Sequence, residues 1–460
     1  MTMLDRVLGR VSRRRPAGAS ISARLADPRR YEAEIDELHR RHLFTRRLYD
    51  LRQDDVPLAS VVMDKRRVSK LIARAVENGS YEIEAGINRT IHVKGKERTI
   101  YAFKLTDLIV HRVVASIVNE AMEPLLSSGL YSYRKGMSWR EPVAGLASYI
   151  REHRRSLPDP RTRGLYVLRR DIHKYADSIP VREGAPIWRM LREVLAGPDG
   201  DQEIRENDWR FIQECARPLL ALEGREFNQI LGVPTGQPIA CSIFNLYLAE
   251  FDRRLAAVPG SFYARYSDDF LFAHPDPEVA RRVGEEIDSL LVDLEIRANV
   301  EKGQDIFLTA AGRPSEAWPE AKGTTIVPFL GCLVSGTGTV ALDQKKLRQF
   351  LRDVDRRARR TVRAMDGQPE ERVGRAVCAA INQSTHPKNS LLGQASAPLL
   401  RRAVTDRGQL DQLDYKVARI VAGAVSGHHK VRAFRRISYK RIRKDWGLQS
   451  LLHARNKWGA

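Results

Sequence analysis

The sequence predicts an α+β fold in which strands and helices are interleaved up to residue 342 and helices continue alone from residue 343. One observation is the stretch 262–272, where apolar and aromatic residues flank a Ser-Asp-Asp turn as the two strands of a hairpin do. A second is the apolar stretch 165–172, a strand that ends in the carboxylate of Asp171. The third is the helical spacing of apolar residues after residue 343, and no internal repeat interrupts this order.

The composition favours a globular protein with a polyanionic partner. Hydrophobic residues make up 43% of the 460 residues, which excludes a disordered tail and allows two or three subdomains. The 78 Lys and Arg residues outnumber the 57 Asp and Glu residues, so the formal net charge is +21. Such a surplus is typical of proteins that bind nucleic acid. A G+C-rich genome would explain Arg in place of Lys but not the surplus itself.

The cysteines and the hydropathy pattern predict a soluble, cytoplasmic protein. Cys215, Cys241, Cys332 and Cys378 are far apart and form no Cys-x-x-Cys pair, so a reduced protein without a structural zinc site is expected. No apolar run approaches the roughly 18 residues that span a bilayer, and the N-terminus lacks the apolar core of a signal peptide.

The first 150 residues are expected to mix helices and strands. A basic extension over 1–44 begins with a short amphipathic piece and contains a charged helix over 28–42. It contacts RNA or the protein body in one interpretation and is a solvated arm in the other. Helical spacing marks 68–76, 108–118 and 142–153, and the expected strands are 81–84, 89–93 and 99–101, with a basic turn over 94–98.

The central part is expected to build a sheet. After the strand 165–172 the chain is mostly helical to Gly224, and a turn rich in Gly and Pro follows at 232–236. Further predictions are helices over 239–255 and 279–294, a strand region over 296–306, and a strand over 329–334 that enters a glycine turn.

The C-terminal part is predicted to be helical and strongly basic. One apolar helix face lies between 347 and 354 and another between 410 and 421. From 428 to 460 ten Lys or Arg residues stand against Asp445 alone, so this segment supplies +9 of the net charge of +21.

Three carboxylates are expected at one edge of the sheet. Asp171 ends a strand, and the adjacent Asp268 and Asp269 follow about a hundred residues later in the hairpin. Adjacent carboxylates repel each other, and a divalent cation relieves this repulsion, because Mg²⁺ prefers hard oxygen ligands. Three such groups can hold two Mg²⁺ ions, or Mn²⁺ in their place, in a site for nucleotidyl transfer. A solvated Asp-Asp turn is the other interpretation of the hairpin taken alone.

The order of the motifs resembles that of reverse transcriptases. Their two first catalytic motifs are similar to 171–179 and 232–248, and their Tyr-x-Asp-Asp box is similar to Tyr-Ser-Asp-Asp at 266–269. The motif after the box resembles 299–302, the primer grip resembles 329–331, and a fingers motif of bacterial and group II intron enzymes resembles 132–138. The resemblance covers about residues 85 to 345 and implies a right-hand polymerase. Its parts would be the basic extension over 1–44, fingers and palm over 45–342, and a helical thumb with a basic C-terminal region over 343–460.

The resemblance implies a role for each matching residue. Asp171, Asp268 and Asp269 would bind the metal ions, with the Ile172 carbonyl as a further ligand. Lys302 fits the proton donor to pyrophosphate, with a solvated lysine as the alternative. The expected nucleotide contacts are Arg134, Arg98, Ile172, Ala176, Gly236 and Gln237, with Gly232 to Gly236 lining the nucleotide and template side.

Other matching residues would contact nucleic acid or support the fold. The expected nucleic-acid contacts are Phe329, Leu330, Gly331, Arg435, Arg436, Lys440 and Arg441. Arg134 has an alternative role as a surface arginine that pairs with a nearby carboxylate. Ser242 and Asn245 are expected to support their helix.

Two positions depart from the family pattern. Thr235 stands where Gln is common, a change shared by many bacterial types. Ala176 stands where a Phe or Tyr usually lies beneath the 2′ position of the nucleotide and excludes ribose by clash. Tyr175 is expected to pack elsewhere. The sequence therefore predicts weaker discrimination against ribonucleotides than is usual in the family.

The C-terminal part indicates which type of reverse transcriptase the chain resembles. It lacks the carboxylate cluster of a ribonuclease H and the Cys/His array of an intron-type endonuclease, and the Asn-Ala-x-x-His motif of retron enzymes is absent from the sequence. The chain is then similar to the bacterial "unknown group" enzymes of antiphage defence, relatives of retron and group II intron enzymes. Some of them copy a partner noncoding RNA into DNA from dNTPs or prime on protein. Ser438 or Tyr439 would prime in cis, with a phosphate-binding basic helix as the alternative.

Two other classes of function stay open. One is a polymerase that uses ribonucleotides or no template, which Ala176 alone favours. The other is a non-catalytic RNA-binding scaffold, for which the basic tail suffices. The intact set of three aspartates argues against the scaffold, because clustered carboxylates are costly to keep ionised. The sequence indicates no oligomeric state.

Overall fold

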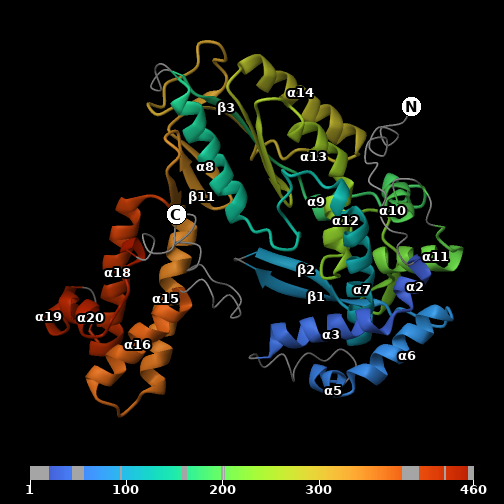
Figure 1. Ribbon diagram of the computed structural model, residues 1–460, viewed down its shortest axis with the longest axis horizontal. Coiled ribbons are helices and arrows are strands. Elements are labelled where there is room, and N and C mark those ends of the chain that lie inside the picture. The colour runs from blue at the N-terminus through green and yellow to red at the C-terminus, as the bar shows by residue number, and fades with distance from the viewer. Residues whose placement is uncertain are drawn as a thin grey trace. The chain divides into compact units, whose positions relative to one another are not determined.

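The structure, a computed structural model, describes residues 20–43, 56–93, 96–157, 163–197, 200, 203–385, 404–428 and 431–453 (Figure 1). The chain divides into two compact units. The first contains Met1–Met137, Arg169–Phe272 and Glu278–Gly303, and the second contains Ser138–Leu168, Ala273–Pro277 and Gln304–Ala460. The predicted N-terminal amphipathic piece, the centre of the predicted basic turn at Lys94 and Gly95, and the tail residues Lys430, Arg455 and Lys457 lie outside the described residues.

Helices begin the first unit. They are α2 (Ile21–Leu25), α3 (Pro28–His42), α5 (Leu58–Met63), α6 (Lys65–Glu77), α7 (Leu105–Met122) and the short 3-10 helix η1 (Glu123–Leu125). The helix predicted over 28–42 is confirmed. Asp27 caps it by accepting from the N–H of Arg29, and Pro28 occupies its first position, where no N–H is needed. The buried face of α3, with Tyr31 and Ile35, packs on α6 and α7, so this part of the extension contacts the protein body.

A four-stranded sheet also belongs to the first unit. Its strands are β1 (Gly86–Val93), β2 (Lys96–Ala102), β4 (Leu220–Leu222) and β5 (Arg225–Phe227), in the order β2-β1-β4-β5. The strand predicted over 81–84 is wrong. The Tyr81 hydroxyl and the Glu84 N–H donate to the carboxylate of Asp107 at 2.7 and 3.2 Å, so a side chain of α7 satisfies this segment in place of a partner strand.

The predicted hairpin and the strand beside it are confirmed in the first unit. β6 (Phe262–Tyr266), β7 (Asp269–His274) and the end of β3 (Leu165–Asp171) follow the order β6-β7-β3. The accompanying helices are α9 (Tyr175–Ser178), α10 (Pro186–Ala196), α11 (Glu206–Ala216), α12 (Ile239–Tyr247), α13 (Ala249–Ala256) and α14 (Pro277–Asp293).

Two predictions about this region are corrected. The single helix predicted over 239–255 is two helices, because the backbone leaves the helical conformation at Leu248, with φ −107° and ψ 12°. The strand predicted over 296–306 begins only at Gln304. Before it the described backbone makes one isolated bridge, between Ala298 and Ile172.

The second unit contains short strands and the C-terminal helices. The strands after β3 are β8 (Gln304–Leu308) and β9 (Lys322–Thr324), in the order β3-β8-β9, and a separate sheet of β10 (Ile326–Phe329), β11 (Cys332–Ser335) and β12 (Val340–Leu342). The helices are α8 (Arg140–Arg155), α15 (Gln344–Ala364), α16 (Glu370–Thr385), α18 (Arg407–Ser426), α19 (Val431–Arg436) and α20 (Tyr439–Lys444). Helices therefore dominate after residue 343, as predicted.

The strand predicted over 329–334 is interrupted by a turn. Leu330 and Gly331 have φ values of +50° and +74°, and two successive left-handed residues make the tight turn that joins β10 to β11. Among the described residues, none of the helices is long and apolar enough to cross a lipid bilayer.

Candidate active site

Asp171 ends β3 where the strand emerges from the core. Residues 165–168 are buried, and the next three are partly exposed. The N–H of Asn299 donates to the carbonyl of Asp171 at 2.7 Å. The Asn299 amide and the Lys302 Nζ donate to Asp171 Oδ1 at 3.3 and 2.7 Å. The segment that the sequence places after the Asp-Asp box thus lies against the first aspartate.

The turn between β6 and β7 brings the second aspartate to the same place. Ser267, the first residue of the turn, is left-handed with φ +62°. The carbonyl of Asp268 accepts a hydrogen bond of 3.1 Å from the N–H of Ile172, the residue directly after Asp171. The backbone therefore joins the end of β3 to the turn and sets Asp268 beside Asp171.

Asp269 is the first residue of β7, and the charges of both other aspartates affect its pKa. Burial raises its pKa to about 6, and Asp171 and Asp268 add to this rise, whereas Arg169 and Lys302 oppose it. Arg169 Nε lies 3.7 Å from Asp269 Oδ1, too far for a hydrogen bond. That buried oxygen has no hydrogen-bond partner among the described residues. Asp171 and Asp268 are thus close enough to destabilise the charge of Asp269.

This donor set fits Mg²⁺ that arrives with a nucleotide. In the described part of the chain no three His, Cys, Asp or Glu side chains form a ready metal cluster. Mg²⁺ is usually held by one or two carboxylates together with substrate phosphates, and it does not need a cage made by protein alone. A bound cation would satisfy the buried, unpartnered oxygen of Asp269 and relieve its repulsion by Asp171 and Asp268.

A comparison with protein families agrees with this geometry. The family model described as "Reverse transcriptase (RNA-dependent DNA polymerase)" matches residues 92–334, which is more than half of the 460 residues and includes all three aspartates. The chain belongs to the reverse transcriptase family. The predicted α+β fold of a right-hand polymerase with a helical C-terminal part is confirmed.

Solved structures similar to this reverse transcriptase include telomerases from two Candida species. Telomerase from Candida albicans, in complex with the TWJ fragment of telomeric RNA, has 10% identity and a TM-score of 0.44 over 83% of this chain and 64% of that one. Apo telomerase from Candida tropicalis has 11% identity and a TM-score of 0.44 over 81% of this chain and 68% of that one. The chain spans less than two thirds of the first telomerase. No curated protein matches it.

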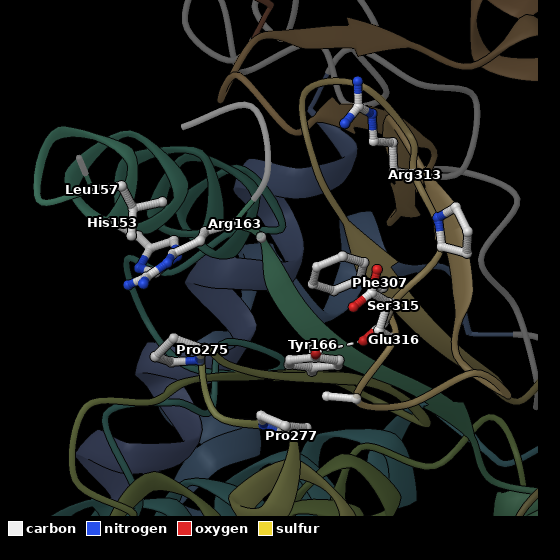
Figure 2. Close-up of a pocket in the computed structure, with 13 residues that line it drawn as sticks. His153, Leu157, Arg163, Tyr166, Pro275, Pro277, Phe307, Arg313, Ser315 and Glu316 are labelled. Carbon is white, nitrogen blue, oxygen red and sulfur yellow. Dashed lines mark hydrogen bonds between the residues drawn. The ribbon is translucent and has the colours of Figure 1, made fainter. Parts of the chain in front are cut away.

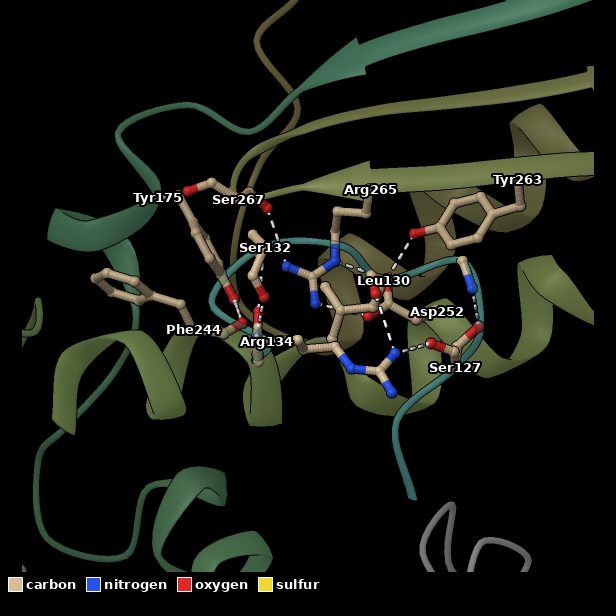
Figure 3. Close-up of polar contacts among 12 residues, drawn as sticks. Ser127, Leu130, Ser132, Arg134, Tyr175, Phe244, Asp252, Tyr263, Arg265 and Ser267 are labelled. Carbon is tan, nitrogen blue, oxygen red and sulfur yellow. Dashed lines mark hydrogen bonds and ion pairs between the residues drawn. The ribbon is translucent and has the colours of Figure 1, made fainter. Parts of the chain in front are cut away.

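Two side chains predicted to contact the nucleotide are directed into the protein. In this reverse transcriptase Arg134 pairs with Glu123 at 2.6 Å, and its Nη1 donates to the carbonyls of Ser127 and Leu130 (Figure 3). This is the arrangement given above as the alternative for Arg134. Gln237 is 3% exposed and donates to the carbonyl of Ala216 at 3.1 Å. A nucleotide contact by either residue requires a rotamer change and stays a prediction.

The remaining nucleotide predictions concern small residues and Arg98. Gly236 has φ +121°, and a Cβ there would lie 2.5 Å from the carbonyl oxygen of Tyr101, so glycine is required. Ala176 is partly exposed in α9, and its carbonyl accepts the N–H of Val233 at 2.7 Å. The backbone of Arg98 belongs to β2, and its side chain lies outside the described residues.

The aromatic residue beside Ala176 is fixed elsewhere, as expected. Tyr175 is 4% exposed, and its hydroxyl donates to the carbonyl of Phe244 at 2.7 Å. Asn245 is buried and exchanges hydrogen bonds with Ser132, so it supports the packing of α12. Tyr175 and Asn245 therefore both make their hydrogen bonds inside the protein.

The predicted primer grip is a turn in the second unit. Phe329 is 1% exposed, and the carbonyl of Leu330 accepts from Nζ of Lys346 at the start of α15. The same ammonium lies 3.3 Å from the ring centroid of Trp139. The backbone of Leu330 and Gly331, with its left-handed φ values, is therefore held by a lysine from the next helix.

The side chains of the tail that are predicted to contact nucleic acid differ in their ion pairing. Arg435, Arg436 and Lys440 are exposed, and Arg436 Nε lies 4.0 Å from Glu370 Oε2. Arg441 pairs more closely, with Glu370 at 2.8 Å and with Glu371 at 2.6 Å. Ser438 caps α20 by accepting the N–H of Arg441. The hydroxyl of Tyr439 accepts from Arg443 Nε at 3.0 Å, so both candidate priming hydroxyls already have structural partners.

A cavity of about 700 Å³ lies in the second unit (Figure 2). Tyr166 and Phe307 stack at its base with ring centroids 4.8 Å apart, and Arg163 and Arg313 stand at its edge. Its lining contains none of the predicted site residues. The cavity therefore adds nothing to the site built around the three aspartates.

Sequence reasoning missed two charged residues next to the turn. Arg265 lies in β6 and Asp252 in α13, and both side chains are fully buried. A charged residue at an inward position of an apolar strand was the signal for Arg265, because such a residue must have a buried partner.

Proposed function

We propose that this reverse transcriptase synthesises DNA on an RNA template by two-metal nucleotidyl transfer. The observation that carries the proposal is the convergence of Asp171, Asp268 and Asp269, with burial and mutual repulsion raising the pKa of Asp269 to about 6. Two bound Mg²⁺ ions would activate the primer 3′-hydroxyl and neutralise the triphosphate. The three carboxylates, with the Ile172 carbonyl, would hold these ions.

The other residues of the site act on the leaving group. The primer 3′-oxygen attacks the α-phosphorus of the dNTP, the bond from that phosphorus to the bridging oxygen breaks, and pyrophosphate leaves. Lys302, with its ammonium 2.7 Å from Asp171 Oδ1 and its side chain 55% exposed, is positioned at the site and can give a proton to that oxygen. Arg134 and Arg98 would bind the triphosphate once their side chains reach it.

The template and the biological role are finer parts of the proposal. The sequence resembles bacterial unknown-group enzymes of antiphage defence, which supports a partner noncoding RNA as template, dNTPs as substrates and DNA as product. The exposed cations of α19 and α20 support RNA binding. The four cysteines are free, which supports the reducing environment of the cytoplasm.

The test is an extension assay with the purified protein and its co-purified RNA. Each labelled deoxynucleotide or ribonucleotide is supplied in turn with Mg²⁺, beside the variant Asp268→Asn. We expect deoxynucleotide incorporation that needs the RNA and is lost in the variant. Tight RNA binding without incorporation of any nucleotide would favour the scaffold. In cells, Asp268→Asn should also abolish protection in a phage plating assay, and full protection by that variant contradicts a defence role for synthesis.

A second candidate, use of ribonucleotides, is favoured by the surroundings of Ala176. The hydroxyl of Tyr175 donates to the carbonyl of Phe244 and its ring packs on the Phe244 ring. Tyr175 therefore does not replace the bulky side chain that is missing at position 176. We expect wild type to incorporate ribonucleotides more readily, relative to deoxynucleotides, than Ala176→Tyr does. Equal rejection by the two proteins contradicts this expectation.

A further inference from the structure

A fully buried ion pair lies beside the turn that carries Asp268. Arg265 Nε and Nη2 donate to the two carboxylate oxygens of Asp252 at 2.6 Å each, and both side chains are 0% exposed. The hydroxyl of Tyr263 donates to Asp252 Oδ1 at 2.6 Å. This fork geometry fixes the plane of the guanidinium.

Beyond the two guanidinium nitrogens that donate to Asp252, the third nitrogen of Arg265 is directed at the turn. Arg265 Nη1 donates to the carbonyl of Ser267 at 3.0 Å (Figure 3). Ser267 has φ +62°, which a residue with a Cβ adopts only when other contacts compensate. The bond from Arg265 is such a contact, so the guanidinium stabilises the left-handed conformation that the turn needs.

Two successive carbonyls of the turn are then held by hydrogen bonds. The Ser267 carbonyl is bonded to Arg265, and the next carbonyl, of Asp268, is bonded to the N–H of Ile172. The hydroxyls of Tyr133 and Ser267 lie 3.2 Å apart, which adds a contact from the fingers motif. Loss of the bond from Arg265 would leave the Ser267 carbonyl without this donor, while the Asp268 carbonyl would still accept from Ile172.

Arg265 also bonds through its backbone to the segment directly before the fingers motif. Its N–H donates to the carbonyl of Gly129 at 2.8 Å, and its carbonyl accepts the N–H of Tyr131 at 3.0 Å. The segment that continues to Arg134 is thus attached to the same residue that holds the turn. One buried arginine therefore connects the turn at Ser267 with the segment that leads into the fingers motif.

A role in stability alone does not explain a charged pair at this place. Replacing a buried ion pair by apolar side chains of similar volume is often neutral or stabilising, whereas removing one partner is strongly destabilising. Packing would therefore be served equally well by apolar residues. What apolar residues cannot do is donate to the carbonyl of Ser267.

We propose that Arg265, oriented by Asp252, is a positioning residue that fixes the Ser267–Asp268 peptide and thereby the place of the Asp268 carboxylate relative to Asp171. The inference rests on the proposed function, because it concerns the carboxylates that would hold the metal ions. It assigns Arg265 no contact with substrate.

The decisive experiment separates stability from positioning. The triple variant Asp252→Leu/Tyr263→Phe/Arg265→Met removes the buried charges and the hydroxyl that would lose its acceptor. Arg265→Met alone leaves the buried charge of Asp252 without its cationic partner. We expect Arg265→Met to melt far below wild type and the triple variant to recover most of that loss. Despite this recovery, the triple variant should bind Mn²⁺ in the presence of a dNTP about 10- to 100-fold more weakly by electron paramagnetic resonance.

Single-turnover incorporation is the second readout. At saturating dNTP the triple variant should be about 10²-fold slower than wild type per active site, because a small misplacement of a reacting group has an effect of this size. A triple variant that melts like wild type and matches it in Mn²⁺ affinity and rate overturns the inference. If wild type incorporates no nucleotide, the proposed function fails, and the difference in Mn²⁺ affinity still decides the role of Arg265.

Two further variants complete the design. Arg265→Lys keeps a charge beside Asp252, but one ammonium cannot form the fork and also reach Ser267. It should bind Mn²⁺ more weakly, and wild-type affinity in this variant overturns the inference even where the triple variant does not fold. Arg112→Met is the matched control. It breaks a 2.7 Å pair with Glu34 whose side chains are 14% and 20% exposed, so it should lower the melting temperature and leave Mn²⁺ affinity and rate unchanged.

Discussion

His111 makes the stability of the first unit depend on pH. Its side chain in α7 is 0% exposed, and both ring nitrogens lack a hydrogen-bond partner among the described residues. Burial lowers the pKa of His111 from 6.5 to about 4. The ring is therefore neutral in the folded protein, and its edge packs against Phe103 with centroids 4.9 Å apart.

The sign and the size of the effect follow from linkage. Below pH 6.5 the unfolded chain takes up a proton at this position and the folded chain does not, so stability falls as the pH decreases towards the folded pKa of about 4. Between pH 7 and pH 4.5 this group alone should remove about 2 kcal/mol from the free energy of unfolding. The loss is complete below the folded pKa.

The assay is urea unfolding of wild type and His111→Leu at both pH values. Groups that the two proteins share cancel in the comparison, so the variant should lose about 2 kcal/mol less than wild type between pH 7 and pH 4.5. His92→Leu is the control for the loss of an exposed imidazole, because the side chain of His92 is 71% exposed and its Nε2 lies 3.0 Å from Glu97 Oε1. An identical pH dependence in wild type and His111→Leu refutes the reasoning, since it would mean that the ring is protonated in the folded state.

Three other predictions concern the site and the tail. Lys302→Met should slow single-turnover incorporation by about 10²-fold if the lysine donates a proton, and an unchanged rate would mean that it is only a solvated cation. Gly236→Ala should lower the free energy of unfolding, measured in urea, by about 2 kcal/mol, because the new Cβ would meet the Tyr101 carbonyl. Gly79→Ala, whose Cβ would lie in open space, should lower the free energy of unfolding by less. If the tail contacts about six phosphates, the log–log salt slope of RNA binding should be near −5 in wild type. Replacing Arg435, Arg436 and Lys440 by Gln should bring this slope about 2 closer to zero. An unchanged slope contradicts RNA contact by these side chains.

The sequence predicted the elements whose signal is local. The helix over 28–42 has its own cap and apolar face, and the hairpin around Asp268 has apolar strands on both sides, so both were found with nearly the observed bounds. The segment 81–84 alternates as a strand does, yet its partner is the side chain of Asp107 in a later helix. A contact of that kind leaves no local pattern.

The residues of the candidate site also fall into those with a local sequence signal and those whose contacts leave none. The three aspartates lie in recognisable motifs, and the structure brings them together at the end of β3. The partner of Arg134 could not be predicted, because the choice between Glu123 and a triphosphate is a matter of tertiary packing. Arg265 was noticed only as part of a strand, since a buried ion pair is visible only when both partners are located. The proposed metal and nucleotide contacts stay predictions.

The packing of α2 and α3 has a practical consequence for anyone who shortens this protein. A solvated arm was one of the two interpretations of residues 1–44, yet Ile21, Leu25 and Tyr31 are each at most 1% exposed. Arg24 and Arg30 pair with Glu120 of α7 at 2.7 and 2.9 Å. A truncated protein that starts after α3 would expose the apolar surface that these side chains cover and would leave Glu120 without both arginines. Low yield or aggregation of such a fragment would then report a damaged fold and would say nothing about whether the arm binds RNA.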